Sequence, residues 1–192
     1  MTDDLNKTQG ASDTRNAWVR AALERYQQPL IRYAARLTGN VETARDVVQD
    51  TFVKLCAADP AKVGGYLPQW LYRVCRNRAL DVRKKEGRMS SLEQAHVLSF
   101  NGNGRAVENA AESNETHALV LEAVGKLPEK QQEVFRLKFE HGMTYREIGA
   151  VMDMPLSTVS YTITQGLGRI RARLRTKIGT EIRTQRTPSH DK

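Results

Sequence analysis

The chain has 192 residues, 40% of them hydrophobic and 27% charged, enough for one ordinary domain or two small ones. Its 30 Lys and Arg outnumber 22 Asp and Glu, and the net charge of +8 favours an anionic partner, either nucleic acid or a membrane. A membrane-spanning helix is not expected, because it needs roughly 20 apolar residues in a row. No apolar segment typical of a secretory signal follows the polar residues 1–15, so no secretory signal is predicted. The expected location is the cytoplasm, whose reducing conditions fit two free cysteines.

The two cysteines indicate no metal site. Cys56 and Cys75 form no Cys-x-x-Cys pair, and no histidine cluster accompanies them. We therefore expect neither a metal nor any other cofactor. Free thiols packed on apolar helix faces are favoured, although the sequence also permits one disulfide.

The first half of the chain predicts three helices after a disordered leader over residues 1–15. Apolar residues recur at helical spacing from 18 to 37, and Pro29 inside this pattern is expected to kink or divide the helix. Gly39 ends it. A second helix is predicted over 41–57 and a third from 67 or 68 to about 85, with a loop containing Gly64 and Gly65 between them.

The second half begins after a change of composition. Residues 86 to about 111 are rich in Ser, Asn, Gly and Glu, which is typical of a flexible linker. Helical periodicity then resumes over 118–127, and Pro128 fits the first position of a helix that continues to 140. No strand pattern is present. The predicted fold is all-α, with two small helical domains joined by a flexible linker. The predicted boundaries are 1–15 (leader), 16–87 (first domain), 88–112 (linker), 113–178 (second domain) and 179–192 (disordered tail).

Residues 144–171 predict a helix-turn-helix. Thr144 and Glu147 form a capping box at the first helix start, and Gly149 provides the small side chain that a close approach needs. Asp153 stands at the turn position that often requires positive φ. Ser157 is the expected N-cap of the second helix. The predicted buried stripe of that helix consists of Val159, Ile163, Leu167, Ile170 and Leu174.

A helix-turn-helix places the start of its second helix in the DNA major groove. The residues expected to contact DNA there are Ser157, Thr158, Ser160, Tyr161, Thr164 and Gln165. Further along the same helix Arg169, Arg171 and Arg173 are expected to neutralise phosphates, followed by Arg175 and Lys177.

Three segments in this order, residues 44–52, 70–81 and 127–135 with the helix-turn-helix after them, make the chain resemble the extracytoplasmic-function family of RNA polymerase sigma factors. The resemblance covers roughly residues 18–176. It implies promoter recognition without catalysis. The first domain would bind the beta-prime coiled coil of core polymerase and the −10 element, and the second would bind the beta flap and the −35 element. An anti-sigma factor is a possible further partner.

The resemblance also implies site residues in the first domain. Asp46, Gln49 and Asp50 match polymerase-facing positions. The loop over 56–69 and Asn77 match positions that hold a base extruded from the −10 strand. Trp70 is equally compatible with a place in the core. The residues expected at the −10 element are Tyr66, Trp70, Arg73, Arg76, Asn77, Asp81, Arg83 and Lys84.

Two other classes of function are compatible with parts of the sequence. A stand-alone helix-turn-helix regulator with a sensing N-terminal domain would explain residues 118–177, but not the acidic face at 42–50 beside the basic helix at 73–88. A nuclease would need clustered carboxylates. Asp46 and Asp50 lie one turn apart, yet no third carboxylate, histidine or Gly-rich phosphate loop accompanies them.

Overall fold

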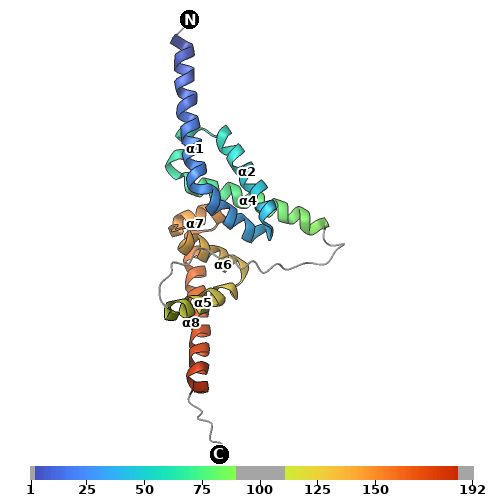
Figure 1. The fold of residues 1–192 in the computed structure, drawn as a ribbon, viewed down its shortest axis with the longest axis vertical. Helices are drawn as coiled ribbons and strands as arrows, with labels where there is room; N and C mark the ends of the chain where they lie inside the picture. The colour runs from blue at the N-terminus through green and yellow to red at the C-terminus, as the bar shows by residue number, and fades with distance from the viewer. Residues whose placement is uncertain (1–2, 90–110, 186–192) are drawn as a thin grey trace, which may run out of the picture. The chain divides into compact units, whose positions relative to one another are not determined.

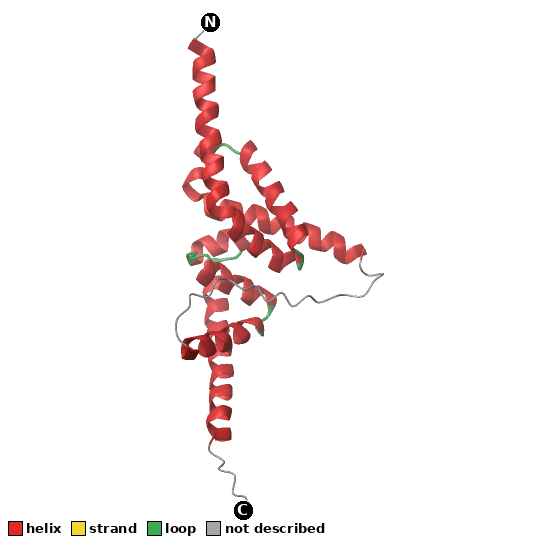
Figure 2. Ribbon diagram, viewed as in Figure 1, coloured by secondary structure: helices red, strands yellow, loops and turns green. Residues whose placement is uncertain are grey.

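The computed structural model describes residues 3–89 and 111–185, and every regular element within these ranges is helical (Figures 1 and 2). The chain divides into two compact units, the first formed mainly by α1 to α4 and the second by α5 to α8. The all-α prediction is therefore confirmed. Most of the predicted linker (residues 90–110), the first two residues and the end of the predicted tail (residues 186–192) lie outside the described residues.

The first unit contains α1 (Asp3–Thr38), α2 (Val41–Ala57), α3 (Pro60–Val63), the 3-10 turn η1 (Gly64–Tyr66) and α4 (Leu67–Met89). The second contains α5 (Ala111–Gly125), α6 (Glu129–Phe135), the π-helical turn η3 (Arg136–Glu140), α7 (Tyr145–Met152) and α8 (Leu156–Gln185). The bounds of α2 are those the sequence predicts.

Several helices are longer than their sequence patterns indicate. Helix α1 begins at Asp3, where a disordered leader was predicted, and α8 continues to Gln185, into the predicted tail. Once a packed turn has nucleated a helix, each added residue gains one backbone hydrogen bond, which favours continuation of the helix past that turn. Pro29 does not divide α1, because Leu30 and Ala34, one and five residues after it, are fully buried and hold this part of the helix in the core.

Helices α1, α2 and α4 pack against one another to form the core of the first unit. Leu30, Leu55 and Leu71, one from each helix, are fully buried. The rings of Tyr33 and Tyr72 meet edge to face at 5.1 Å between centroids. The predicted apolar face of α2 is confirmed, with Val47, Val48, Thr51, Phe52 and Leu55 all buried.

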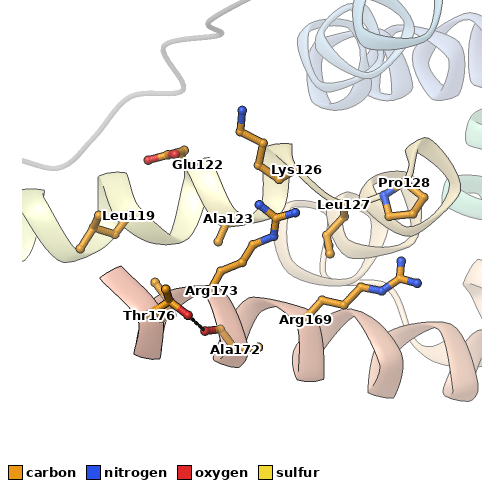
Figure 3. Close-up of a pocket in the computed structure, with 11 residues that line it drawn as sticks. Leu119, Glu122, Ala123, Lys126, Leu127, Pro128, Arg169, Ala172, Arg173 and Thr176 are labelled. Carbon is orange, nitrogen blue, oxygen red and sulfur yellow. Dashed lines mark hydrogen bonds between the residues drawn. The ribbon is translucent and has the colours of Figure 1, made fainter. Parts of the chain in front are cut away.

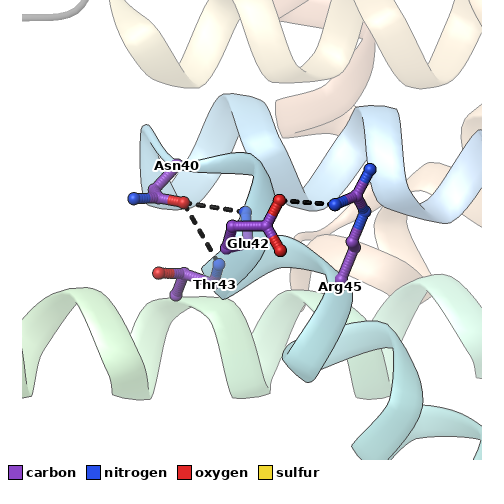
Figure 4. A network of polar contacts seen from close by, with 4 residues as sticks. All are labelled: Asn40, Glu42, Thr43 and Arg45. Carbon is purple, nitrogen blue, oxygen red and sulfur yellow. Dashed lines mark hydrogen bonds and ion pairs between the residues drawn. The ribbon is translucent and has the colours of Figure 1, made fainter.

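Polar contacts fix the start of α2. The side-chain oxygen of Asn40 accepts hydrogen bonds from the backbone N–H groups of Glu42 (2.8 Å) and Thr43 (3.2 Å), as Figure 4 shows. Gly39 before it has φ of 76°, the left-handed backbone that favours glycine at a helix end. Glu42 also pairs with Arg45 on the outer face. The chain therefore reverses direction sharply between α1 and α2, which brings the two helices side by side.

The core of the second unit is smaller. Val134, Leu137, Ile148 and Val159 are almost completely buried. On α5 the inward residue is Ala123 rather than Leu121, which is 55% exposed although the periodic pattern included it. Pro128 is the N-cap of α6 and not its first helical residue, since its ψ of 145° is extended and its carbonyl accepts the N–H groups of Gln131 and Gln132.

Candidate nucleic-acid and polymerase interfaces

The turn between α7 and α8 has the geometry of a helix-turn-helix. The backbone N–H of Thr144 donates to the Glu147 carboxylate at 2.7 Å, and the Thr144 hydroxyl accepts the Glu147 N–H at 3.3 Å, so the predicted capping box is confirmed. Asp153 follows α7 with φ of 55° and ψ of 53°, as its turn position predicts. The two helices are thus held at a fixed angle by local backbone geometry.

Gly149 is required by this turn. A Cβ atom on Gly149 would lie 2.7 Å from the carbonyl oxygen of Met154 and 3.9 Å from a methyl group of Val159. The Met154 N–H donates to the Gly149 carbonyl at 2.9 Å, which pulls the turn onto α7. The sequence therefore identified Gly149 correctly as a site of close approach. The group that approaches it is mainly the backbone of the turn.

Helix α8 begins one residue before Ser157, so the prediction that Ser157 is its N-cap is wrong. The carbonyl of Pro155 accepts the N–H groups of Thr158 (3.0 Å) and Val159 (3.1 Å), as the residue before a first turn does. Proline has no N–H to leave unpaired at this position. The Ser157 hydroxyl is exposed, and it lies in the first turn of α8.

The buried stripe of α8 agrees with the predicted one in part, since Leu174 is only partly buried and Thr162 is buried as well. Val159, Ile163 and Ile170 are buried, but Leu167 is 40% exposed. Gly166 is buried in its place, where an added Cβ would lie 2.4 Å from the ring of Phe135. An aromatic ring on α6 thus occupies the space that a side chain of α8 would fill. Sequence periodicity did not reveal this, because it scores side chains and glycine has none.

The exposed face of α8 carries most of the residues predicted for duplex DNA. Only Thr158 is partly buried, and Tyr161 is 66% exposed. The exposed members of the predicted set are Ser157, Ser160, Tyr161, Thr164 and Gln165.

The arginines of α8 divide between two faces. Arg171 and Arg175 continue the face of Ser160 and Thr164, at spacings of seven and four residues. Arg169 faces α6 instead, and its guanidinium donates to the side-chain oxygen of Gln131 at 3.0 Å. The three predicted phosphate contacts Arg169, Arg171 and Arg173 therefore do not form one row.

Arg169 and Arg173 border a groove between α5 and α8, with a volume of about 810 Å³ (Figure 3). Leu119 and Ala123 from α5, and Leu127 in the turn after it, supply apolar walls, while Lys126 and Glu122 extend along the rim. The groove lies within the second unit and is more apolar than the face that carries the hydroxyl groups.

In the first unit, the predicted polymerase-facing residues lie on the outer side of α2. Asp46 and Gln49 are exposed. Asp50 is partly exposed and accepts a hydrogen bond from Nε of Arg78 on α4 at 2.7 Å. The carboxylate of Asp50 thus has a partner inside its own unit, which the sequence analysis did not foresee because Arg78 lies 28 residues further along the chain.

Helix α4 and the turn before it bring four of the predicted −10 residues onto one face. Tyr66, Trp70, Arg73 and Asn77 follow one another at spacings of three or four residues. Tyr66, Arg73 and Asn77 are exposed, whereas Trp70 is half-buried and so contributes both to packing and to the surface.

The remaining predicted −10 residues flank this face. Asp81 and Lys84 extend it towards the end of α4 and are exposed. Arg76 and Arg83 lie on an adjacent side of the helix, with Arg76 half-buried and Arg83 exposed. The result is a surface with aromatic rings at one end and cations along its length, a combination that suits stacked bases and phosphates of a single strand.

Residues 3–89 and 111–185 contain no group of three His, Cys, Asp or Glu residues placed to hold a metal ion. Both cysteines are free. No helix among the described residues is long and apolar enough to cross a membrane.

Two family models match the chain in the order of its two units. Residues 22–89 match sigma-70 region 2, and residues 117–170 match sigma-70 region 4. Among curated relatives, the ECF sigma factor SigW of Bacillus subtilis is 28% identical over 159 residues, which cover 78% of this chain and 85% of SigW. The ECF sigma-E factor of Escherichia coli K12 is 29% identical over 144 residues, covering 70% of this chain and 75% of the relative.

The chain belongs to the extracytoplasmic-function family of RNA polymerase sigma factors. Members of this family direct transcription initiation and are not enzymes. The resemblance predicted from three motifs is confirmed, and the alternative of a sensing N-terminal domain is not supported, because residues 22–89 match region 2.

The fold of this sigma factor is also that of two solved relatives. The sigma factor RpoE of Bartonella quintana, in complex with the anti-sigma factor NepR, superposes with a TM-score of 0.60 at 22% identity, over 81% of this chain and 96% of RpoE. CnrH, in complex with the cytosolic domain of CnrY, gives a TM-score of 0.55 at 24% identity, over 88% of this chain and 94% of CnrH.

Proposed function

We propose that this sigma factor recognises promoters through two separate surfaces, a single-strand surface on α4 and a duplex surface on α8. The observation that carries the proposal is the face of Tyr66, Trp70, Arg73 and Asn77, which offers rings, an amide and a cation in one row of the region 2 match. Extruded bases need hydrogen-bond partners for their edges, and Asn77 supplies both a donor and an acceptor.

The α8 surface has a different chemistry. Its hydroxyl groups and one amide contact several bases and discriminate less sharply than an arginine paired with guanine. Discrimination between promoters therefore falls more on Asn77 and on residues 56–69, which were predicted as a loop but contain α3 and η1 between the end of α2 and the start of α4. The chain itself catalyses no reaction, and it acts in the cytoplasm, where its template lies.

Transcription from a promoter library by core polymerase with the full-length sigma factor tests this division. We expect Asn77→Ala to change which −10 sequences are transcribed. Replacing Arg171 and Arg175 by Ala together should lower all promoters by a similar factor, since phosphates carry no sequence information. The opposite pattern, with the arginine pair shifting preference and Asn77→Ala scaling every promoter equally, would reverse the assignment.

Core polymerase binds, in this proposal, to the exposed side of α2 at Asp46, Gln49 and Asp50 through its beta-prime coiled coil. Asp50→Arg should weaken co-purification with core. This substitution also breaks the pair with Arg78, so Arg78→Ala is the matched control, because it removes the same ion pair and keeps the carboxylate. Equal loss of core binding in both variants would mean that the pair matters only for the shape of the unit.

The groove between α5 and α8 is the proposed site for the beta flap of core polymerase, since its apolar walls suit the apolar face of a helix. Leu119 lines the groove, while Leu121 on the same helix is exposed and does not. We expect Leu119→Gln to weaken core binding and Leu121→Gln to leave it unchanged. Identical effects of the two substitutions would argue against the groove.

Control by an anti-sigma factor is the final part of the proposal. It is supported by the two relatives of the same fold, whose structures are complexes with NepR and with the cytosolic domain of CnrY. Purification of the chain from its native host before induction should yield a regulator-bound form with little core polymerase. Recovery of the chain bound only to core polymerase under all conditions would contradict this regulation.

A further inference from the structure

Arg15 reaches from α1 to the far end of α2. Its Nη2 atom donates hydrogen bonds to the carbonyl oxygens of Cys56 at 2.6 Å and of Ala58 at 2.8 Å. The last carbonyls of a helix have no donor within the helix, and they form its negative end. One guanidinium therefore donates hydrogen bonds to two carbonyls at the end of α2 and adds its positive charge to that of Lys54 in the last turn.

The segment that follows α2 is short and is held in place by local contacts. The carboxylate of Asp59 accepts the N–H of Ala61 at 3.0 Å and caps α3, and Val63 is buried with 6% of its surface exposed. The segment then reaches Tyr66, which is 48% exposed at the start of the α4 face. Arg15 fixes the beginning of this segment, and Asp59 and Val63 fix its middle.

We propose that Arg15 is a positioning residue for the promoter strand. It orders the segment over residues 58–66 before DNA arrives, so that Tyr66 meets the strand with little further loss of chain entropy. This inference rests on the proposed function of that segment and of α4. Arg15 lies outside both family matches, which cover residues 22–89 and 117–170.

The test uses holoenzyme reconstituted with the full-length chain, and compares Arg15→Ala with Arg20→Ala, an exposed arginine of the same helix. The first readout is hydrogen exchange of amides 58–66. The second is binding of a single-stranded oligonucleotide that carries the −10 sequence of a transcribed promoter. For Arg15→Ala we expect faster exchange in this segment and about tenfold weaker strand binding, with unchanged core binding. Arg20→Ala should match the original chain, and Arg15→Lys should recover part of both effects, because an ammonium group can still reach a carbonyl.

Two results would overturn the inference. One is unchanged exchange and strand binding in Arg15→Ala. The other is an equal loss of helical content and core binding, which would show that Arg15 only stabilises the unit. Asn77→Ala in the same strand-binding assay shows whether a negative result concerns only the positioning role of Arg15 or the proposed −10 surface as a whole. If Asn77→Ala weakens binding and Arg15→Ala does not, only the positioning role fails. If neither weakens binding, the proposed −10 surface fails as well.

Discussion

The two units of this sigma factor are both helical, but they obtain their shape in different ways. The first packs long helices side by side, and its core consists of large side chains such as Leu30, Leu55 and Leu71. The second packs the short helices α6 and α7 closely against the long helix α8, and at Gly149 and Gly166 it depends on the absence of a side chain. The first unit should therefore be sensitive to lost volume and the second to added volume.

Removing core volume should have the largest effect, and it should be confined to one unit. Leu71→Ala is expected to destabilise the first unit by about 3 kcal/mol, because a fully buried leucine leaves both lost contacts and a cavity. Both tryptophans, Trp18 and Trp70, belong to the first unit, so denaturation followed by tryptophan fluorescence measures that unit alone. Leu137→Ala in the second unit is the control and should leave this transition in place. An equal shift by both variants would mean that the units unfold together.

Alkaline pH should also weaken the first unit, because it holds the buried thiol of Cys75. Burial raises the pKa of the Cys75 thiol from 9.0 to about 12, partly opposed by a hydrogen bond with Thr51. The thiol stays neutral in the folded chain while it ionises in the unfolded chain, so stability falls as pH rises from 9.0 towards about 12. The loss should be about 2 kcal/mol near pH 10.5, at about 1.4 kcal/mol per pH unit. Urea denaturation followed by tryptophan fluorescence at pH 9.0 and at about pH 10.5 measures this loss of stability. A Cys75→Ala chain with the same pH dependence would show that the Cys75 thiol is not its cause.

Adding a methyl group at a glycine should test how far the stability of the second unit depends on close approach of its helices. Gly149→Ala is expected to cost about 2 kcal/mol, because the new Cβ would meet the Met154 carbonyl and backbone cannot move aside as a side chain can. Gly168→Ala on α8 has open space and should stabilise the helix by up to about 1 kcal/mol. Hydrogen exchange of α7 and α8 in the intact chain reports both changes. Protection lowered equally by the two substitutions would show that helix propensity, and not close approach, decides this unit.

The smallest expected effect separates the arginines of α8. Replacing Arg171 and Arg175 together by Ala should reduce the slope of log K against log salt by about 2 for holoenzyme binding to duplex DNA with a −35 element, at about 0.9 per phosphate contact. Replacing Arg169 and Arg173 should change this slope less, since they border the groove beside α5. A larger change in slope from the second pair would indicate that Arg169 and Arg173, and not Arg171 and Arg175, contact DNA phosphates.

Patterns within single helices were predictable from sequence. The apolar face of α2, the capping box of Thr144 and Glu147, and the positive φ of Asp153 each depend on residues within a few positions of one another. Family membership followed from the same local patterns, because three motifs in a fixed order are difficult to obtain otherwise. These features follow from backbone geometry and hydrogen bonding within a turn or two, and they need no knowledge of the rest of the chain.

Tertiary structure alone decided which residues meet across the fold. The pairing of Asp50 with Arg78, the two carbonyls held by Arg15 and the ring of Phe135 over Gly166 join residues that are distant in sequence. It also decided that Leu167 is exposed and that Arg169 meets Gln131 on α6. Helical periodicity places a residue on a side of its own helix, but it does not say which partner lies opposite. That choice depends on how helices pack, and therefore on the volume and charge of side chains that no local pattern connects.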